Sequence, residues 1–164
     1  EKNIKAVVLT LRQLKGFSVT EENIVNGLNN TVRNTGLMGR WQKLGEEPTI
    51  ICDTAHNKEG LSIVINQLSE QKYNQLHIVL GFVKDKKLTD ILPLFPKNAM
   101  YYFCKPEISR GLEAEVLKEK ALEYALEGVV YSSVSAAFES AKKSAGVSDF
   151  IYVGGSTFVV AEIL

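Results

Sequence analysis

The sequence has few of the residues that build metal centres, disulfide frameworks or charged binding faces. Its 164 residues include two histidines and two cysteines, with neither CxxC nor zinc-ligand spacing, so a histidine-rich or zinc site is excluded. Nineteen basic and nineteen acidic residues cancel, which leaves no electrostatic reason to expect nucleic acid or an anionic membrane as a partner. Every uncharged apolar stretch is much shorter than the roughly 20 residues of a membrane helix.

The two cysteines, Cys52 and Cys104, lie in apolar, strand-like segments. Unpaired cysteine behaves as a small apolar residue, so we expect two buried free thiols. No secretory leader is recognisable, and together with free thiols this predicts a cytoplasmic protein.

Three common nucleotide-binding and hydrolase motifs are also absent. There is no GxxxxGK(S/T) phosphate loop and no GxGxxG after the first predicted strand, which argues against a self-contained P-loop enzyme and a dinucleotide-binding dehydrogenase. GxSxG is missing too, so a serine hydrolase is not indicated. The composition is otherwise ordinary, since 45% of the residues are hydrophobic and the length suits one domain with a short appendage.

The first 38 residues have a helical pattern. Apolar residues at helical spacing predict a helix over 3–14, and Thr20 with the acidic residues after it predicts a second helix that runs to about Leu28. The stretch 29–39 is rich in Asn, Thr and Gly, and we interpret it as a linker. We therefore place a boundary between a short helical segment, 1–38, and a larger domain, 39–164.

The larger domain alternates between strand-like and helix-like patterns. This alternation predicts an α/β fold with a mostly parallel sheet, helices on both faces and right-handed crossovers. The predicted strands are 40–44, 48–53, 76–82, 99–104, 129–131 and 150–153. The predicted helices are 59–71, 87–94, 113–126, 135–144 and 157–163.

The most informative segment is TIICDTAHNKEG, residues 49–60, in which a buried strand ends among polar residues and a helix begins. Ligands bind at such places in parallel sheets, because the loops diverge and the helix presents free N–H groups. Asp53 suits a ribose or an ammonium group, and His56 suits a carboxylate or a phosphate. Helix capping is an alternative for Asp53 and the favoured role of Asn57, and a structural role is the alternative for His56.

Three further residues are candidates for ligand contact because of where they lie relative to the predicted strands. Arg40 lies where the linker meets the first strand, and there it can clamp a phosphate held by a neighbouring domain, although a surface salt bridge is the alternative. Ser156 follows two glycines and the last strand, where it either meets a ligand or caps the last helix. Arg110 follows the strand 99–104, whereas Lys84–Lys87 looks more like a solvated helix start. With the segment 53–57, Arg110 and Ser156 are predicted to share one edge of the sheet.

These residues resemble a known family. GR at 39–40 and DTAHNKEG at 53–60 resemble the GR…DGAHNP pattern that opens the carboxy-terminal domain of folylpolyglutamate and dihydrofolate synthases, members of the Mur ligase superfamily. SRGLEAEVL and VGGSTFVVAEIL are similar to later segments of that domain, and residues 14–41 resemble the last amino-domain helices and the interdomain linker. The likeness covers nearly the whole chain, with Thr54 and Lys58 standing where the family usually has Gly and Pro.

The resemblance implies a Rossmann-like Mur ligase carboxy-terminal domain in an ATP-dependent ligase. In such enzymes ATP phosphorylates a folate or dihydropteroate carboxylate, and the amine of L-glutamate attacks the acyl phosphate to form an amide. The phosphate loop and the Mg²⁺ ligands are expected in an amino-terminal domain, of which residues 1–38 would be the helical tail and linker. This chain alone is therefore expected to be inactive, with no nucleophile, base or metal ligand of its own.

The resemblance also assigns roles to single residues. Arg40 and Asp53 would bind ATP, His56 and Ser156 would line the glutamate pocket, and Asn57 and Arg110 are further candidates. The expected partners are ATP, L-glutamate, folate or dihydropteroate, and the protein's own P-loop domain, in a monomer. Two alternatives stay open, namely a Mur-type ligase for a peptidoglycan precursor or cyanophycin, and a non-catalytic α/β binding module.

Overall fold

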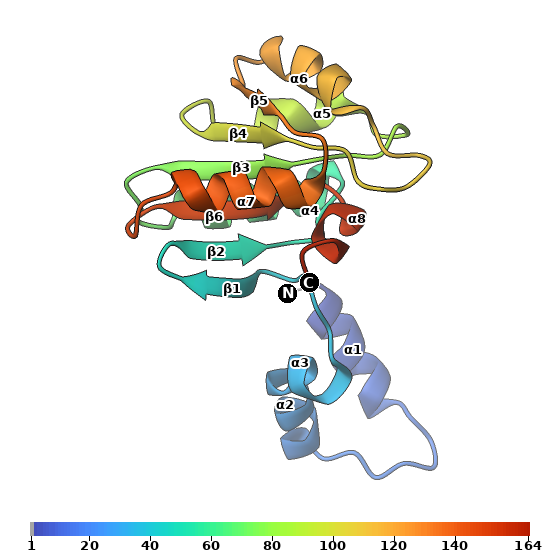
Figure 1. The fold of residues 1–164 in the computed structure, drawn as a ribbon. Helices are drawn as coiled ribbons and strands as arrows, with labels where there is room; N and C mark the ends of the chain where they lie inside the picture. The colour runs from blue at the N-terminus through green and yellow to red at the C-terminus, as the bar shows by residue number, and fades with distance from the viewer. Residues whose placement is uncertain (1) are drawn as a thin grey trace. The chain divides into compact units, whose positions relative to one another are not determined.

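The chain folds into two units that divide between Met38 and Gly39 in the computed structural model, which describes residues 2–164 (Figure 1). The first unit contains the helices α1 (Lys2–Arg12), α2 (Glu21–Asn29) and α3 (Thr31–Thr35). No helix among the described residues is long and apolar enough to cross a membrane.

Local hydrogen bonds explain the helices of the first unit. Thr20 Oγ1 accepts the N–H of Asn23 at 3.1 Å while the Asn23 side chain accepts the Thr20 N–H, so a capping box starts α2. The helix α3 differs from the unstructured linker predicted over 29–39. At its start the hydroxyl of Thr31 donates to the Leu28 carbonyl at 2.9 Å, and the helix ends at Gly36, whose φ of 64° is left-handed.

The second unit is built on a six-stranded sheet in the order β1-β2-β6-β3-β4-β5. Its strands are β1 (Gln42–Glu46), β2 (Thr49–Cys52), β3 (Leu76–Leu80), β4 (Met100–Phe103), β5 (Gly128–Val130) and β6 (Phe150–Gly154). Only β1 runs antiparallel, against β2 at one edge, and all other pairs are parallel. The predicted α/β class with a mostly parallel sheet is confirmed.

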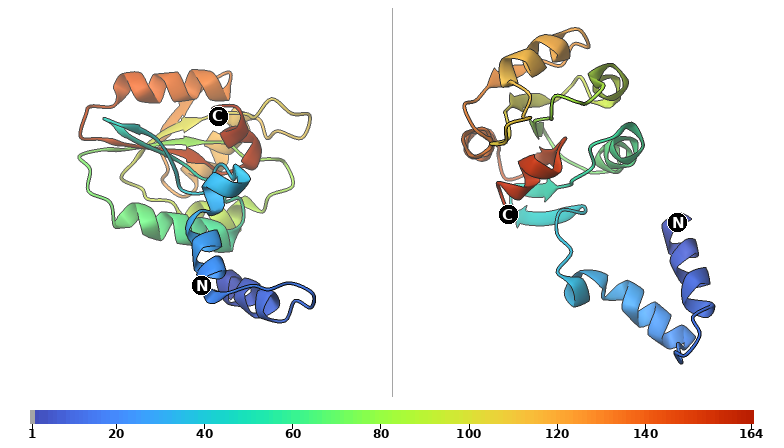
Figure 2. Two further views of the ribbon diagram at one scale, coloured as in Figure 1. Left: turned by 90° about the horizontal axis from the view of Figure 1, so that it is seen from below. Right: turned by 90° about the vertical axis from the view of Figure 1, so that its right-hand side faces the viewer.

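Helices cover both faces of this sheet, and Figure 2 shows α4 and α7 on opposite sides of it. One face packs against α4 (Lys58–Ser69), α5 (Leu88–Ile91), the 3₁₀ turn η1 (Leu92–Leu94) and α6 (Ala114–Leu122). The other packs against α7 (Val134–Ser144) and α8 (Thr157–Ala161). Several helices end earlier than predicted. Pro93 converts the end of the 87–94 helix into a 3₁₀ turn, and Ala125 turns left-handed at φ 59° after α6.

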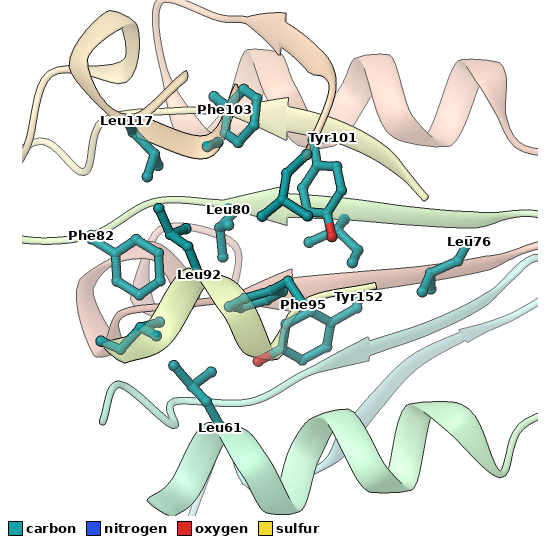
Figure 3. Packing of buried hydrophobic residues seen from close by; sticks show 14 of the residues in the cluster. Leu61, Leu76, Leu80, Phe82, Leu92, Phe95, Tyr101, Phe103, Leu117 and Tyr152 are labelled. Atoms are coloured by element: carbon teal, nitrogen blue, oxygen red, sulfur yellow. The ribbon is translucent and has the colours of Figure 1, made fainter. Parts of the chain in front are cut away.

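Large apolar side chains fill the space between the sheet and its helices. In Figure 3, Leu61 of α4 and Leu92 of η1 point toward Leu80 and Tyr152 of the central strands. Full burial of one such side chain contributes roughly 1.5–3 kcal/mol, so these layers hold the loops between them in place. Both cysteines are free and fully buried, as predicted, and burial raises the pKa of the Cys52 thiol to about 11.

A buried polar network ties the amino ends of the central strands together. His77 contacts the Tyr102 hydroxyl through Nδ1 at 2.9 Å and Asp149 Oδ2 through Nε2 at 3.4 Å. Asp149 also accepts the N–H groups of Gly146 at 2.7 Å and Gln75 at 3.1 Å. These hydrogen bonds, that from Gly146 first, lower the pKa of the Asp149 carboxyl below its ordinary value.

Asp149→Asn should destabilise the domain by about 1–3 kcal/mol at neutral pH, because an amide group cannot accept all three hydrogen bonds. Since the folded-state pKa of Asp149 is lowered, its contribution is full above the unfolded pKa of about 3.9 and is lost as the pH falls through the folded value. Urea denaturation of both proteins at pH 7 and at pH 3 tests this. A stability difference that does not shrink at pH 3 would contradict the assignment.

Candidate functional site

Four parallel strands, β2, β6, β3 and β4, end at the same edge of the sheet. The loop after each strand carries one or more of the polar residues singled out in the sequence. Because β6 lies between β2 and β3, the loops on either side of β6 belong to segments far apart in the chain. A crevice at the carboxyl ends of such strands is the usual ligand site of an open α/β sheet.

A pocket of about 250 Å³ lies at this edge. It is lined by His56, Val83, Asp85, Lys86, Arg110, Ser156, Thr157 and Phe158. Three predicted site residues, His56, Arg110 and Ser156, therefore share one pocket. Arg40, Asp53 and Asn57 do not line it.

His56 and Ser156 are held by local hydrogen bonds that leave groups for a ligand. Nδ1 of the exposed His56 lies 3.0 Å from the Thr54 carbonyl oxygen, which can only accept, so Nδ1 carries the proton and Nε2 is the free ring nitrogen. Ser156 is only 3% exposed, and its Oγ accepts the N–H of Phe158 at 3.2 Å at the start of α8. Its hydroxyl hydrogen remains available to donate into the pocket.

Arg110 enters the pocket from the loop after β4. Its guanidinium carbon lies 5.1 Å from the centre of the Phe158 ring, a cation–π contact that leaves the N–H groups available. The carbonyl of Arg110 accepts the N–H of Lys84 at 2.9 Å, and Gly111 bridges to Val83, so this loop is joined to the loop after β3.

The pocket includes two charged residues that the sequence analysis did not select, Asp85 and Lys86. Asp85 is exposed, Lys86 is partly buried and α5 begins at Leu88, so the predicted solvated helix start over Lys84–Lys87 agrees with the structure, although these two side chains also line the pocket. Neither they nor Arg110 form an ion pair within residues 2–164. Their position in the loop after the buried strand β3 was the sequence feature that could have indicated a place in the site.

Asp53 is buried, with 8% exposure, and does not line the pocket. Its Oδ2 accepts the N–H of Trp41 at 2.6 Å, and its Oδ1 accepts the N–H of Ala55 at 2.7 Å. Capping of α4, the alternative considered for Asp53, is instead the role of Asn57, whose Oδ1 accepts the N–H of Gly60 at 2.8 Å.

Arg40 is exposed, and Nη1 donates weakly to the Gly39 carbonyl at 3.3 Å. The surface salt bridge considered as an alternative is not formed to any residue the structure describes. Both neighbours are left-handed, Gly39 at φ 66° and Trp41 at φ 44°. A bulky residue in this region costs on the order of 1–3 kcal/mol, so surrounding contacts must hold Trp41 there.

The fold and the pocket together define a Rossmann-like α/β domain with a charged pocket at the carboxyl edge of its parallel sheet. The chain belongs to the Mur ligase family, since residues 39–157 match the family described as Mur ligase, glutamate ligase domain. The resemblance stated from the sequence is confirmed.

Individual relatives show which enzymes of the family the chain is similar to. The chain is 34% identical to a probable bifunctional folylpolyglutamate synthase/dihydropteroate synthase of Haloferax volcanii, over 98% of this chain and 19% of that protein. The structure of Escherichia coli FolC with DHPP and ADP superposes with a TM-score of 0.84 at 28% identity, covering 99% of this chain and 38% of that one. A bifunctional folylpolyglutamate synthase/dihydrofolate synthase with Mn, AMPPNP and L-glutamate bound gives a TM-score of 0.78 at 26% identity, over 94% and 36%. The chain thus spans well under half the length of these relatives.

Proposed function

We propose that this chain is the carboxy-terminal part of an ATP-dependent ligase that adds L-glutamate to a folate or dihydropteroate carboxylate. The second unit would hold the incoming amino acid and part of the ATP site. Support comes from the family membership of residues 39–157 and from a relative whose structure contains L-glutamate and an ATP analogue.

The charge pattern of the pocket is the main observation that supports the proposal. L-Glutamate has two carboxylates and one ammonium group at neutral pH. Arg110 and Lys86 offer two cations, and the Ser156 hydroxyl offers a hydrogen-bond donor. Asp85 offers one carboxylate and His56 offers Nε2 as an acceptor, both of which suit the ammonium group. The volume of about 250 Å³ is below the roughly 300–1,000 Å³ typical of sites for drug-sized ligands, which suits a single amino acid.

In this proposal the chain positions reactants and stabilises charge. The pocket holds the glutamate amine for attack on the acyl phosphate, which replaces a bimolecular encounter with a bound geometry. Arg40 pairs with phosphate oxygens of ATP, where a guanidinium offers two parallel N–H groups. Asp53 is proposed to bind ATP together with Arg40, as the family resemblance implies. We infer no nucleophile or general base among these residues.

Residues 1–38 are proposed to be the helical tail of a preceding P-loop domain together with the interdomain linker. Within the described part of this unit Ile24 is the one fully buried apolar residue, so its helices lack a core of their own. Large apolar side chains are instead exposed at Ile4, Val7, Leu9, Leu14, Phe17, Val19, Val25, Val32, Leu37 and Met38. Exposed apolar surface of this extent suits packing against another domain.

Magnesium is assigned to that preceding domain in the same proposal. Among residues 2–164 no group of three or more His, Cys, Asp or Glu side chains is placed to hold a metal ion. Residues 2–164 therefore do not fit a metal ion.

ADP release by the full-length protein with Mg-ATP, L-glutamate and either dihydropteroate or tetrahydrofolate tests the proposal. Release that depends on both glutamate and one pterin would support the ligase and identify its acceptor. ATP binding without turnover on either pterin would point to another Mur-type acceptor. Loss of ATP binding as well would leave a non-catalytic binding module.

Arg110→Gln should raise the KM for L-glutamate about 10- to 100-fold in the full-length protein, because a charge-assisted contact to a carboxylate would be lost. The kcat at saturating glutamate should change much less. Lys105→Gln is the matched control, since Lys105 lies in the same loop but pairs with Glu113 at 2.6 Å outside the pocket. Equal KM values for the two variants would remove Arg110 from the glutamate site.

A further inference from the structure

We propose that Glu162, at the end of α8, is a positioning residue for the glutamate pocket. It holds residues 105–111, called the Arg110 loop below, in the place from which the Arg110 side chain lines the pocket. The proposal rests on the proposed function, because it assumes that Arg110 meets a carboxylate of L-glutamate. It gives a role in substrate binding to a residue that does not line the pocket itself.

A side-chain hydrogen bond joins the Arg110 loop to the end of α8. Oε1 of Glu162 accepts the N–H of Glu107 at 2.6 Å, between residues 55 positions apart in sequence. Both residues are exposed, and Glu162 forms no ion pair with any residue that the structure describes. The carboxylate is therefore available to hold the loop backbone, three positions before Arg110.

The Arg110 loop is folded tightly upon itself between Glu107 and Arg110. The Pro106 carbonyl accepts the N–H of Ile108 at 2.8 Å, and the Ile108 carbonyl accepts the N–H of Gly111 at 2.9 Å. A Cβ atom on Gly111 would lie 2.5 Å from the Pro106 carbonyl oxygen, so the two ends of this turn are in contact. A shift of the backbone at Glu107 would therefore move Arg110 as well.

The other end of the Arg110 loop is attached to the loop after β3. The Arg110 carbonyl accepts the N–H of Lys84 at 2.9 Å, and the Phe82 carbonyl accepts the N–H of Leu112 at 2.9 Å. These bonds hold the backbone at Arg110 and after it, and the bond to Glu162 holds the backbone before it. Glu162 thus completes the attachment of the loop on both sides of Arg110.

The helix α8 also contacts the Arg110 side chain. Phe158 precedes Glu162 by four positions, a spacing that puts two residues on the same side of a helix. The Arg110 guanidinium carbon lies 5.1 Å from the centre of the Phe158 ring, and both residues line the pocket. Glu162 therefore keeps the loop next to the ring that the guanidinium contacts. Pre-organisation of this kind lowers the entropy lost when a ligand binds.

Steady-state kinetics of the full-length protein test the role. Glu162→Met removes the acceptor and should raise the KM for L-glutamate about three- to tenfold, the size expected for one lost hydrogen bond, while kcat changes less than about twofold. Glu162→Gln keeps an oxygen for the Glu107 N–H, so its KM should stay within about twofold of that of the unmodified protein. Equal KM values for the two variants would overturn the proposal.

Glu123→Met is the matched control. Glu123 ends α6 as Glu162 ends α8, and its Oε1 likewise accepts a hydrogen bond, from Lys120 at 2.8 Å. Glu123 is exposed and does not line the pocket, so the KM for L-glutamate should be unchanged. A rise equal to that of Glu162→Met would mean that lost stability alone explains the effect, and would overturn the role.

A double-mutant cycle tests whether Glu162 acts through Arg110. Arg110→Gln/Glu162→Met should have a KM for L-glutamate within about twofold of that of Arg110→Gln alone, because the loop then has no guanidinium to position. Multiplying losses in the double variant would mean that Glu162 affects glutamate binding by another route, and would overturn the proposal.

Hydrogen exchange separates the role of Glu162 from the proposed function. In the full-length protein without substrates, Glu162→Met should speed exchange of the Glu107 amide at least about threefold, and Glu123→Met should not. Unchanged exchange in Glu162→Met would overturn the attachment of the loop. Absence of glutamate-dependent ADP release by the unmodified protein would instead overturn the proposed function, and with it the role of Glu162 in glutamate binding.

Discussion

Arg40→Ala is expected to lower ligase turnover of the full-length protein about 10²–10³-fold while leaving it folded. That is the range for removal of one pre-organised donor from a developing negative charge. Arg40 is exposed and makes no ion pair within the described chain, so its removal costs no packing. The measurements are steady-state ADP release and a urea denaturation curve on the same preparations.

Two further variants test whether the loss of turnover is specific to the guanidinium of Arg40. Arg40→Lys keeps the charge but loses the paired N–H geometry, so its activity should lie between those of the unmodified protein and Arg40→Ala. Lys43→Ala removes a cation three residues along the chain, where the exposed Lys43 pairs with the exposed Glu46 in β1, and should leave turnover unchanged. Full activity of Arg40→Ala would exclude the residue from the ATP site.

Gly154→Ala is expected to destabilise the second unit by about 3 kcal/mol or more. A Cβ atom there would lie 2.1 Å from the Tyr152 hydroxyl oxygen and 2.9 Å from the Asp53 carbonyl oxygen. Tyr152 is fully buried between β6 and α4, so it has little room to move away, and overpacking in such a place is costly. Chemical denaturation of the 164-residue chain measures the change.

Gly146→Ala is the matched control for that substitution. Gly146 is exposed, and an added Cβ would come no closer than 3.5 Å to any heavy atom outside its chain neighbours, which is ordinary contact. Its stability should stay within about 0.5 kcal/mol of the unmodified chain, as for most surface changes. Equal stability of Gly154→Ala and Gly146→Ala would contradict the close packing described at the end of β6.

Local patterns were sufficient to predict most strands and helices, because burial in a parallel sheet leaves continuous apolar runs such as 150–153. Local patterns failed to predict helix boundaries that depend on single hydrogen bonds or on single backbone angles. The helix α3 lies in a stretch whose composition indicated a linker, and the hydroxyl of Thr31 bonds to a preceding carbonyl at its start. The left-handed Ala125 ends α6 earlier than its apolar spacing predicts.

The candidate site was also predictable in part from the sequence. His56, Arg110 and Ser156 each follow a strand, so the rule for parallel sheets was enough to bring them together. The burial of Asp53 was not predictable, because it depends on a hydrogen bond to Trp41, twelve positions earlier, whose backbone angle no local pattern indicates. Asp85 and Lys86 were missed because a charged run after a strand looks the same whether it faces solvent or a pocket.

The central place of β6 has a consequence for the order of folding. Strands β2 and β3 are consecutive in sequence, yet they do not pair with each other, and each pairs with β6 instead. Until residues 150–154 have left the ribosome, β1–β2 and β3–β4–β5 are separate ribbons with exposed inner edges. Unpaired strand edges invite aggregation and chaperone binding. Such late closure of non-local pairs predicts slow folding and a nascent chain that stays vulnerable until nearly the whole domain has been synthesised.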